Sequence, residues 1–267
     1  MNRQFDIIIV GDSKEGNAAI KNIAADNKSI KIAFISRDFK NTTTRDFLNV
    51  EYIKDEVVFT DYKNRLFCCY LKSGERQYCT HLIIASGLSY APLMARNKAI
   101  PGVLNTVNEI PKTAKQQVAV IVGNTETDAK FALNLAKKYK YVYLCANTVD
   151  IDVTEGTRKK MSDAENLLLI QNVSIAEATF NEGSLTAVKL DNYSSITCNA
   201  IFAKTEATPE VAFVSEKLIS RDNESYLVVT DCSQSLLVPK CYAIGNCVGK
   251  STKKMQAAMI TDILNDF

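Results

Sequence analysis

The order strand, glycine turn, helix and strand occurs twice in this chain, and this duplication limits the folds that it can adopt. The first copy spans residues 5–36 and the second spans residues 118–145. Each copy opens with an apolar run rich in β-branched residues, which is typical of a parallel strand buried on both faces. A strand, a crossover helix and a second parallel strand form a βαβ unit of about 30 residues. The sequence therefore predicts an α/β protein that contains two such units.

The segments around these units predict smaller elements. Residues 50–80 contain three short strand patterns, with a hairpin signal at Gly74. Residues 91–111 hold three prolines, which is typical of a linker. An apolar periodicity at residues 252–264 predicts a closing helix.

The composition excludes several classes of function. Hydrophobic residues make up 46% of the chain and charged residues 23%, which is a globular composition. The net charge of +2 gives no electrostatic basis for binding nucleic acid. Apolar runs stay below the ~18 residues of a membrane span, and the first residues lack the apolar core of a signal peptide. We therefore expect a cytoplasmic protein that binds neither nucleic acid nor membrane.

The histidine and cysteine content narrows the chemistry further. The single histidine, His81, gives little material for a zinc site or for a Ser-His-Asp triad, and we expect no metal site. The 8 cysteines include no CxxC pair, and without a secretory signal they indicate reduced, mostly buried thiols. Cys68 and Cys69 are neighbours on a predicted strand, so we expect their side chains to face opposite sides and to serve in packing.

Glycine turn 1 (residues 11–16) carries the pattern of a dinucleotide site. In such turns the first glycine allows a tight bend, the second lets the backbone approach a pyrophosphate, and the third lets helix and strand pack closely. The helix N-terminus adds amide donors for the phosphates. Gly11 and Gly16 hold the first and third positions, and Ser13 holds the second. A dinucleotide site and an ordinary βαβ turn both stay open at this point.

Glycine turn 2 (residues 123–128) departs further from the pattern. Gly123 keeps the first position, but Thr125 and Asp128 occupy the second and third. The Asp128 carboxylate would stand at the helix N-terminus, where like charge opposes a pyrophosphate. The end of the next strand, up to Asn147, contains no acidic residue for a ribose diol and no arginine for a 2′-phosphate. The pattern predicts that this unit keeps the fold and has lost tight nicotinamide-dinucleotide binding.

The order and spacing of four stretches resemble a known family over nearly the whole chain. The chain is similar to the two-dinucleotide-binding-domain flavoproteins, the family of thioredoxin reductase, coenzyme A disulfide reductase, NADH oxidase and rubredoxin reductase. The stretches correspond to the FAD glycine motif, a strand end beside the flavin, the NAD(P) glycine motif and a late Gly-Asp motif. They lie at residues 5–19, 80–92, 118–135 and 242–258.

This resemblance implies a fold and a domain organisation. The fold is α/β, with two Rossmann-like dinucleotide-binding domains, the second inserted into the first, and a small accessory antiparallel sheet in each. The implied FAD-binding domain is discontinuous, at residues 1–111 and 211–267. The implied NAD(P)-binding-like domain lies between its two parts, at residues 112–210.

The resemblance also implies which residues bind the cofactor. The FAD pyrophosphate would lie over glycine turn 1, the adenine ribose at the end of the second strand, and the flavin beside the later motifs. Asn246 stands where the family has an aspartate, and its amide can still hydrogen-bond there without a charge. The implied set is Gly11, Ser13, Lys14, Glu15, Gly16, Ser36, Arg37, Asp38, Ala85, Ser86, Gly87, Gly245, Asn246, Gln256 and Ala257.

The redox cysteines of the family are missing. Thioredoxin reductases carry a CxxC pair in the second domain, and coenzyme A disulfide reductases carry one cysteine after the second strand. Neither is present here, since residues 37–49 hold no cysteine. The catalytic residues are therefore unknown, except that Cys247 is a redox candidate because it follows Asn246 and precedes a helix that would lower the pKa of its thiol.

Two functions follow from these features. The first is an FAD-dependent oxidoreductase that resembles thioredoxin reductase, with NAD(P)H in doubt and a protein as electron donor or acceptor. The second is a non-catalytic descendant that keeps the fold as an interaction or regulatory subunit. The low glycine count, 10 of 267, and the weakened motifs favour the second. The resemblance implies a homodimer in the first case, and fold alone does not separate the two.

Overall fold

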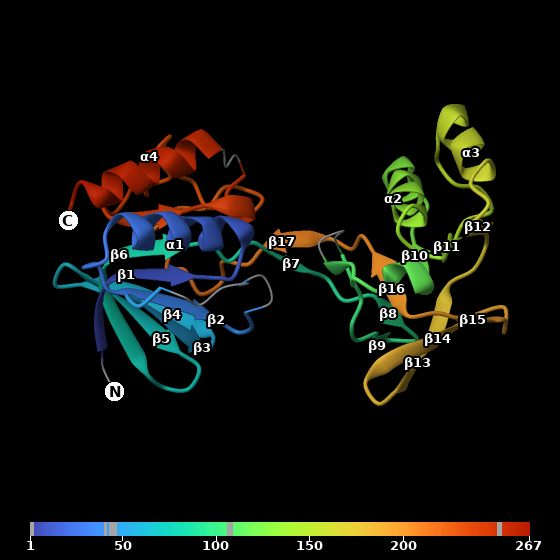
Figure 1. Ribbon diagram of the computed structural model, residues 1–267, viewed down its shortest axis with the longest axis horizontal. Helices are drawn as coiled ribbons and strands as arrows, with labels where there is room; N and C mark the ends of the chain where they lie inside the picture. The colour runs from blue at the N-terminus through green and yellow to red at the C-terminus, as the bar shows by residue number, and fades with distance from the viewer. Residues whose placement is uncertain (1–2, 40–41, 43–46, 106–108, 250–252) are drawn as a thin grey trace. The chain divides into compact units, whose positions relative to one another are not determined.

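The chain divides into two units in the computed structural model, which describes residues 3–39, 42, 47–105, 109–249 and 253–267 (Figure 1). Unit 1 comprises Met1–Ser89 and Ala207–Phe267, and unit 2 comprises Tyr90–Glu206. Unit 2 is thus inserted into unit 1. The chain passes from one to the other in two strands that pair with each other, β7 (Leu88–Tyr90) and β17 (Ala207–Pro209).

The proline-containing segment expected as a linker is part of unit 2. Residues 90–111 belong to that unit, although the family resemblance assigns them to the first domain. Their first part forms a short hairpin, β8 (Met94–Ala95) with β9 (Lys98–Ala99). Ile100 is buried in a core of unit 2, and Leu104 pairs with Phe202. These contacts draw the segment into the second unit.

The sheet of unit 1 has the order β3-β2-β1-β6-β5-β4, with β18 also paired to β6. β6 is long enough to pair antiparallel with β5 through its first half and parallel with β18 through its second half. The accessory antiparallel strands therefore continue the main sheet of this unit. The strands are β1 (Arg3–Val10), β2 (Ile32–Ser36), β3 (Val50–Lys54), β4 (Val57–Lys63), β5 (Leu66–Leu71), β6 (Arg76–Ile84) and β18 (Cys241–Ala243).

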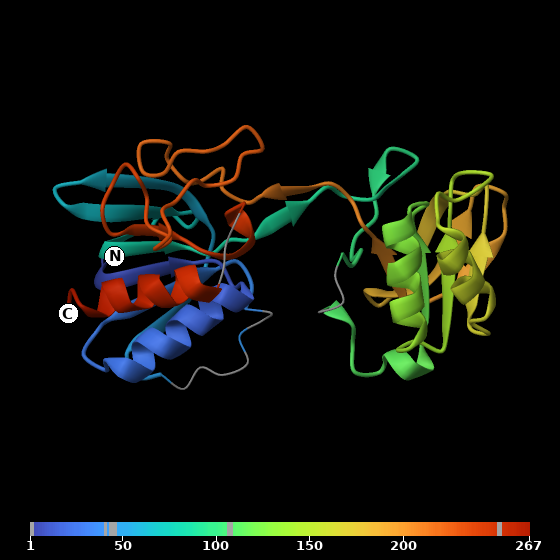
Figure 2. The same cartoon turned by 90° about the horizontal axis from the view of Figure 1, so that it is seen from above.

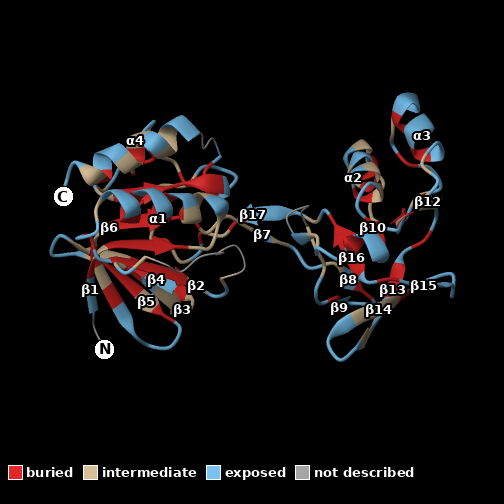
Figure 3. Cartoon of the chain, in the orientation of Figure 1, coloured by how far each residue is buried: buried red, intermediate tan, exposed pale blue. Residues whose placement is uncertain are grey.

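Two helices lie side by side on one face of this sheet, α1 (Lys14–Asp26) and α4 (Lys253–Leu264) (Figures 1 and 2). Both are amphipathic. Ile20 and Ile23 of α1, with Met259 and Ile263 of α4, are buried against the sheet. Figure 3 shows the central strands of the sheet, which lie beneath these two helices, as the most buried part of the unit. Burial of this kind contributes about 1.5–3 kcal/mol per large apolar side chain.

Unit 2 has a parallel sheet in the order β12-β11-β10-β16. Side chains of α2 and α3 form a core with one of its faces. The antiparallel sheet β13-β14-β15 packs against the other face. The elements are η2 (Ala114–Gln116), β10 (Val118–Val122), α2 (Glu126–Ala136), β11 (Tyr141–Cys145), α3 (Glu155–Ser162), β12 (Leu167–Ile170), β13 (Ile175–Asn181), β14 (Ser184–Leu190), β15 (Ser195–Thr197) and β16 (Ala200–Ala203). The predicted α/β class is confirmed.

Candidate dinucleotide site

The carboxyl ends of three neighbouring strands of unit 1 meet at one edge of its sheet. Val10 at the end of β1 and Ala243 at the end of β18 both pair with Ile84 of β6. Glycine turn 1 follows β1, Ala85–Gly87 follows β6, and the short helix η3 (Gly245–Cys247) follows β18. Ligands of open α/β sheets bind at this edge. Three of the stretches singled out in the sequence are therefore brought together.

The two glycines of turn 1 are required by close packing. A Cβ added at Gly11, whose φ is +106°, would lie 2.5 Å from the carbonyl oxygen of Ala85. A Cβ added at Gly16 would lie 2.7 Å from the carbonyl oxygen of Gly11. Turn, helix and the end of β6 are thus in direct contact, as the first and third glycines of a dinucleotide turn require. This contact alone is also compatible with an ordinary βαβ turn.

Polar side chains organise the rest of turn 1. Ser13 is the N-cap of α1, and its Oγ accepts the amide of Gly16 at 3.0 Å. Asp12 Oδ1 accepts Asn17 Nδ2 at 2.7 Å and the Thr42 hydroxyl at 2.7 Å. The amides of the first helical turn, which includes Lys14 and Glu15, have no intrahelical acceptor and point out of the helix N-terminus.

The end of β2, where the resemblance places the adenine ribose, is also polar. The Ser36 hydroxyl donates to the carbonyl of Asp38 at 2.7 Å. Arg37 forms ion pairs with Glu56 and Glu210. The Asp38 carboxylate lies 3.8 Å from Lys54 Nζ and is exposed. Asp38 therefore presents an exposed acidic group just after the end of β2.

Ser86 and Gly87 follow β6 at the converging strand ends. Ser86 Oγ is buried and makes no hydrogen bond of normal geometry with the described residues. Its neighbour Gly87 has a φ of +74°, which turns the chain away from β6.

A cavity of about 780 Å³ lies in unit 1 beside η3. Asn246, Val248 and Met255 of α4 are among its lining residues, whereas Gln256 and Ala257, the predicted contacts from that helix, are not. The lining also includes residues 222–224 and 226–229, which the sequence analysis did not single out as site residues. The signal that would have found them is the polar turn Asp222-Asn223-Glu224 directly before a strand pattern. The volume is in the range of small-molecule sites.

The thiol of Cys247 is poorly suited to redox chemistry. Cys247 is fully buried, and its Sγ lies 3.2 Å from the carbonyl oxygen of Ile244. Burial raises its pKa to about 11, although the Gly87 amide and the Ser86 hydroxyl oppose the rise. The expectation that a following helix lowers this pKa is wrong, because desolvation outweighs any favourable dipole. Cys68 and Cys69 are both buried, as expected of packing residues.

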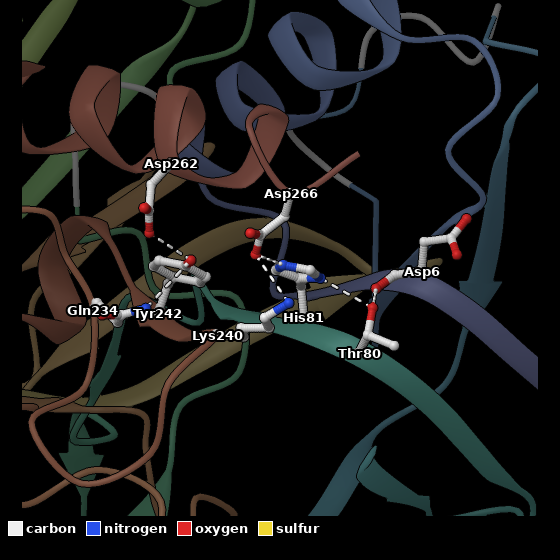
Figure 4. Close-up of polar contacts among 8 residues, drawn as sticks. All are labelled: Asp6, Thr80, His81, Gln234, Lys240, Tyr242, Asp262 and Asp266. Carbon is white, nitrogen blue, oxygen red and sulfur yellow. Dashed lines mark hydrogen bonds and ion pairs between the residues drawn. The ribbon is translucent and has the colours of Figure 1, made fainter. Parts of the chain in front are cut away.

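His81 has partners that the sequence did not reveal. Its Nε2 lies 2.9 Å from Asp266 Oδ2, and Lys240 Nζ lies 3.0 Å from the same oxygen (Figure 4). Nearby, the Tyr242 hydroxyl donates to Asp262 Oδ2 at 2.8 Å. These bonds tie α4 and the residues after it to β6 and β18. His81 therefore has a structural role: it anchors the helix that carries Gln256 and Ala257.

Glycine turn 2 is built differently. Asp128 Oδ2 accepts the amides of Asn124 at 3.1 Å and of Thr125 at 3.0 Å. At the end of the next strand the Asn147 side chain lies 3.4 Å from that of Asn124 and offers no charge. A nicotinamide dinucleotide needs these amides for its pyrophosphate and a charged or diol-binding group for its ribose. The residues of this turn do not fit such a ligand.

The comparisons with known proteins place the chain in a family. The sequence profile described as "Pyridine nucleotide-disulphide oxidoreductase" matches residues 6–260, and the chain belongs to that family. The curated proteins contain no match to it. No metal-binding cluster of His, Cys, Asp or Glu occurs among the described residues. Within the same residues, no helix has the length and apolar character to span a membrane.

Solved thioredoxin reductases share the fold at low sequence identity. The enzyme from Streptococcus pyogenes is 16% identical, with 99% of each chain covered and a TM-score of 0.68. The enzyme from T. acidophilum is 16% identical, with 98% of this chain and 99% of that chain covered and a TM-score of 0.63. A putative thioredoxin reductase from Bacillus anthracis is 15% identical, with 98% and 99% covered and a TM-score of 0.65. These likenesses establish the two-domain fold.

Proposed function

We propose that this chain is an FAD-dependent oxidoreductase whose cofactor binds in unit 1. The observation that carries the proposal is the convergence of glycine turn 1, Ala85–Gly87 and Asn246 on one sheet edge, beside a cavity. FAD, when bound, supplies a group that accepts electrons and passes them on. Family membership supports a flavin at this place.

Different residues of unit 1 would bind different parts of the cofactor. The first-turn amides of α1 would receive the pyrophosphate, with Ser13 as the cap beside them. Asp38 would accept the adenine ribose hydroxyls. Ser86 Oγ and the Asn246 amide would hydrogen-bond polar atoms on the flavin side, and Met255 would pack against the ring from α4.

The electron donor that we assign to this site is a small reduced protein, and NAD(P)H is not expected to serve. Glycine turn 2 lacks the second and third glycines and a ribose-binding charge. Reduction of a disulfide by the family's usual route is not proposed, because no CxxC pair is present. We also propose a cytoplasmic homodimer; light scattering of the purified protein would test the dimer.

The visible absorbance spectrum tests the flavin directly. The protein is purified without added cofactor, and the spectrum is repeated after incubation with FAD and desalting. A retained flavin spectrum is expected. Asn246→Leu removes the polar contact and should lower FAD retention by about tenfold. Gly156→Ala, in a helix of unit 2 where a Cβ has open space, is the matched control. Absence of flavin in both wild-type samples would overturn the proposal.

A non-catalytic interaction subunit is the second candidate, and one contact favours it. A Cβ added at Gly245 would lie 3.0 Å from Glu15 Oε2, so this carboxylate stands between α1 and η3. A negative charge there opposes a pyrophosphate. If this candidate is correct, wild-type protein retains no FAD, whereas Glu15→Gln gains measurable retention.

A further inference from the structure

The start of α2 in unit 2 is the place where a family member would hold the nucleotide phosphates. Gly123 follows β10, and Thr125 is the N-cap of α2. An α-helix leaves the first four amides without intrahelical partners, and together with the helix dipole these amides attract an anion. What fills this position decides whether unit 2 can bind a dinucleotide.

The Asp128 carboxylate already occupies the amides of this turn. Its Oδ2 accepts the Asn124 amide at 3.1 Å, the Thr125 amide at 3.0 Å and the Thr125 hydroxyl at 2.7 Å. In return Thr125 Oγ1 accepts the Asp128 amide at 3.3 Å, which completes a capping box. Asp128 Oδ2 therefore makes the kind of contacts that a phosphate oxygen would make.

The carboxylate also fills the space beside the glycine. A Cβ added at Gly123 would lie 2.3 Å from Asp128 Cγ and 2.5 Å from its Oδ2. Asp128 is 8% exposed. The side chain is therefore packed onto the Gly123 backbone, where the close approach of a pyrophosphate would otherwise occur.

A neighbouring segment closes the turn from a second side. The Asp152 amide donates to the Asn124 carbonyl at 2.9 Å. The Glu126 carboxylate accepts the Thr154 amide at 2.8 Å and the Thr157 hydroxyl at 2.7 Å. Residues 152–157 are thus bonded across the start of α2, and a second carboxylate stands at the same helix end. Both carboxylates would repel a pyrophosphate.

We propose that Asp128 is a built-in substitute for the nucleotide pyrophosphate, so that unit 2 binds neither NADH nor NADPH. The amides of Asn124, Thr125 and Asp128 are satisfied within the chain, and an incoming dinucleotide would have to displace a capped, buried carboxylate. The inference concerns unit 2 alone and does not depend on FAD in unit 1.

Asp128→Gly, which restores the third glycine, is the main test. Binding of NADH and NADPH is measured by isothermal titration calorimetry on the full chain. Wild-type protein is expected to show no binding at about 1 mM nucleotide, and Asp128→Gly should bind at least about tenfold more tightly than wild type. Asp163→Asn, which removes an exposed negative charge at the far end of α3, should behave as wild type.

Two results would overturn the inference. One is binding of either nucleotide to wild-type protein that shifts the Asn124 and Thr125 amide resonances in NMR spectra. The other is a folded Asp128→Gly protein that binds no better than Asp163→Asn. If Asp128→Gly does not fold, Asp128→Asn keeps the shape without the charge, and it must then exceed Asp163→Asn in affinity. The amide shifts of wild-type protein test the claim without any variant.

Discussion

The two glycine turns of this chain start from the same architecture and differ in what occupies the helix N-terminus. In turn 1 the third position is Gly16, which lets α1 pack onto the strand ends. In turn 2 the same position is Asp128, whose carboxylate binds the turn amides. Both turns are capped and both helices form. The fold therefore tolerates either arrangement, and we propose that ligand binding does not.

The difference also has an energetic meaning. An intramolecular carboxylate stabilises a helix start without the loss of translational and rotational freedom that a bound ligand incurs. A first-turn acid contributes about 0.3–1 kcal/mol through the helix dipole, and an N-cap contributes about 1 kcal/mol. In turn 2 the Asn124 and Thr125 amides thus stabilise the fold through Asp128, whereas in turn 1 the Gly16 amide donates to the Ser13 cap.

The largest expected effect is that of Gly11→Ala. The new Cβ would meet backbone atoms of Ala85 and Ser86 at about 2.5 Å, and the φ of +106° is strained for alanine. Backbone cannot yield as a flexible side chain can, so we expect a loss of about 3–5 kcal/mol in the free energy of unfolding. Urea unfolding measures this loss, with Gly156→Ala as control. A loss below about 1 kcal/mol would contradict the packing of turn 1.

Gly123→Ala should be milder and, unlike Gly11→Ala, reversible by a second substitution. Its Cβ would meet the Asp128 side chain and not backbone. We expect a loss of about 2 kcal/mol. In the background of Asp128→Ala the same change should cost at least about 1 kcal/mol less, because the clash is gone. Additive losses in this double-mutant cycle would show that Asp128 does not fill the turn.

Removal of the N-cap side chains should have a smaller effect on stability, and the effect should be similar in the two turns. Ser13→Ala and Thr125→Ala each remove a side-chain acceptor and should each cost about 1 kcal/mol in urea unfolding. Ser13→Gly should cost only a few tenths of a kcal/mol, because glycine is a tolerable N-cap. This change also restores the second glycine, so FAD retention should be equal or higher. Lower retention would mean that Ser13 itself contacts the cofactor.

Acidification should lower the stability of the two units over different pH ranges, and these effects are the smallest that we expect. Burial, more than any other cause, lowers the pKa of His81 from 6.5. The unfolded state then binds more protons, so unit 1 loses stability as pH falls below 6.5. In unit 2 the Thr157 hydrogen bond is the main cause that lowers the pKa of Glu126 from 4.5 to about 2. Its contribution is therefore lost only as pH falls below 4.5.

Methyl resonances of buried methionines report on each unit in urea titrations. Met259 lies in unit 1 and Met161 in unit 2. Between pH 7.5 and 5.5 the Met259 midpoint should fall and the Met161 midpoint should stay constant. His81→Gln should remove most of the pH dependence at Met259. Equal shifts at both methionines would assign the effect to general charge and not to His81.

The fold can be predicted from the sequence because the signals that define its elements are local. Apolar runs, turn glycines and helix periodicity place the βαβ units and both glycine turns. Even the capping box of turn 2 is visible as Thr125 followed three residues later by Asp128. The sequence analysis predicted the charge of Asp128 at this helix end, but not the bonds that it makes.

The features that sequence analysis missed depend on distant contacts. His81 and Asp266 are 185 residues apart, and no local pattern links them. The pKa of Cys247 moves opposite to expectation because burial beneath the end of β6 is a tertiary property. The unit boundary at Ser89 reflects the packing of Ile100 and Leu104 in unit 2, which a proline count cannot reveal.

The central claim is that turn 1 is open to a dinucleotide and turn 2 is closed by its own carboxylate. Hydrogen–deuterium exchange of the wild-type chain, with FAD and then with NADPH, tests both halves in one experiment. FAD should slow exchange at residues 11–17 and 245–249, and NADPH should leave residues 123–129 unchanged. Protection of residues 123–129 by NADPH, or no protection of residues 11–17 by FAD, would contradict the account.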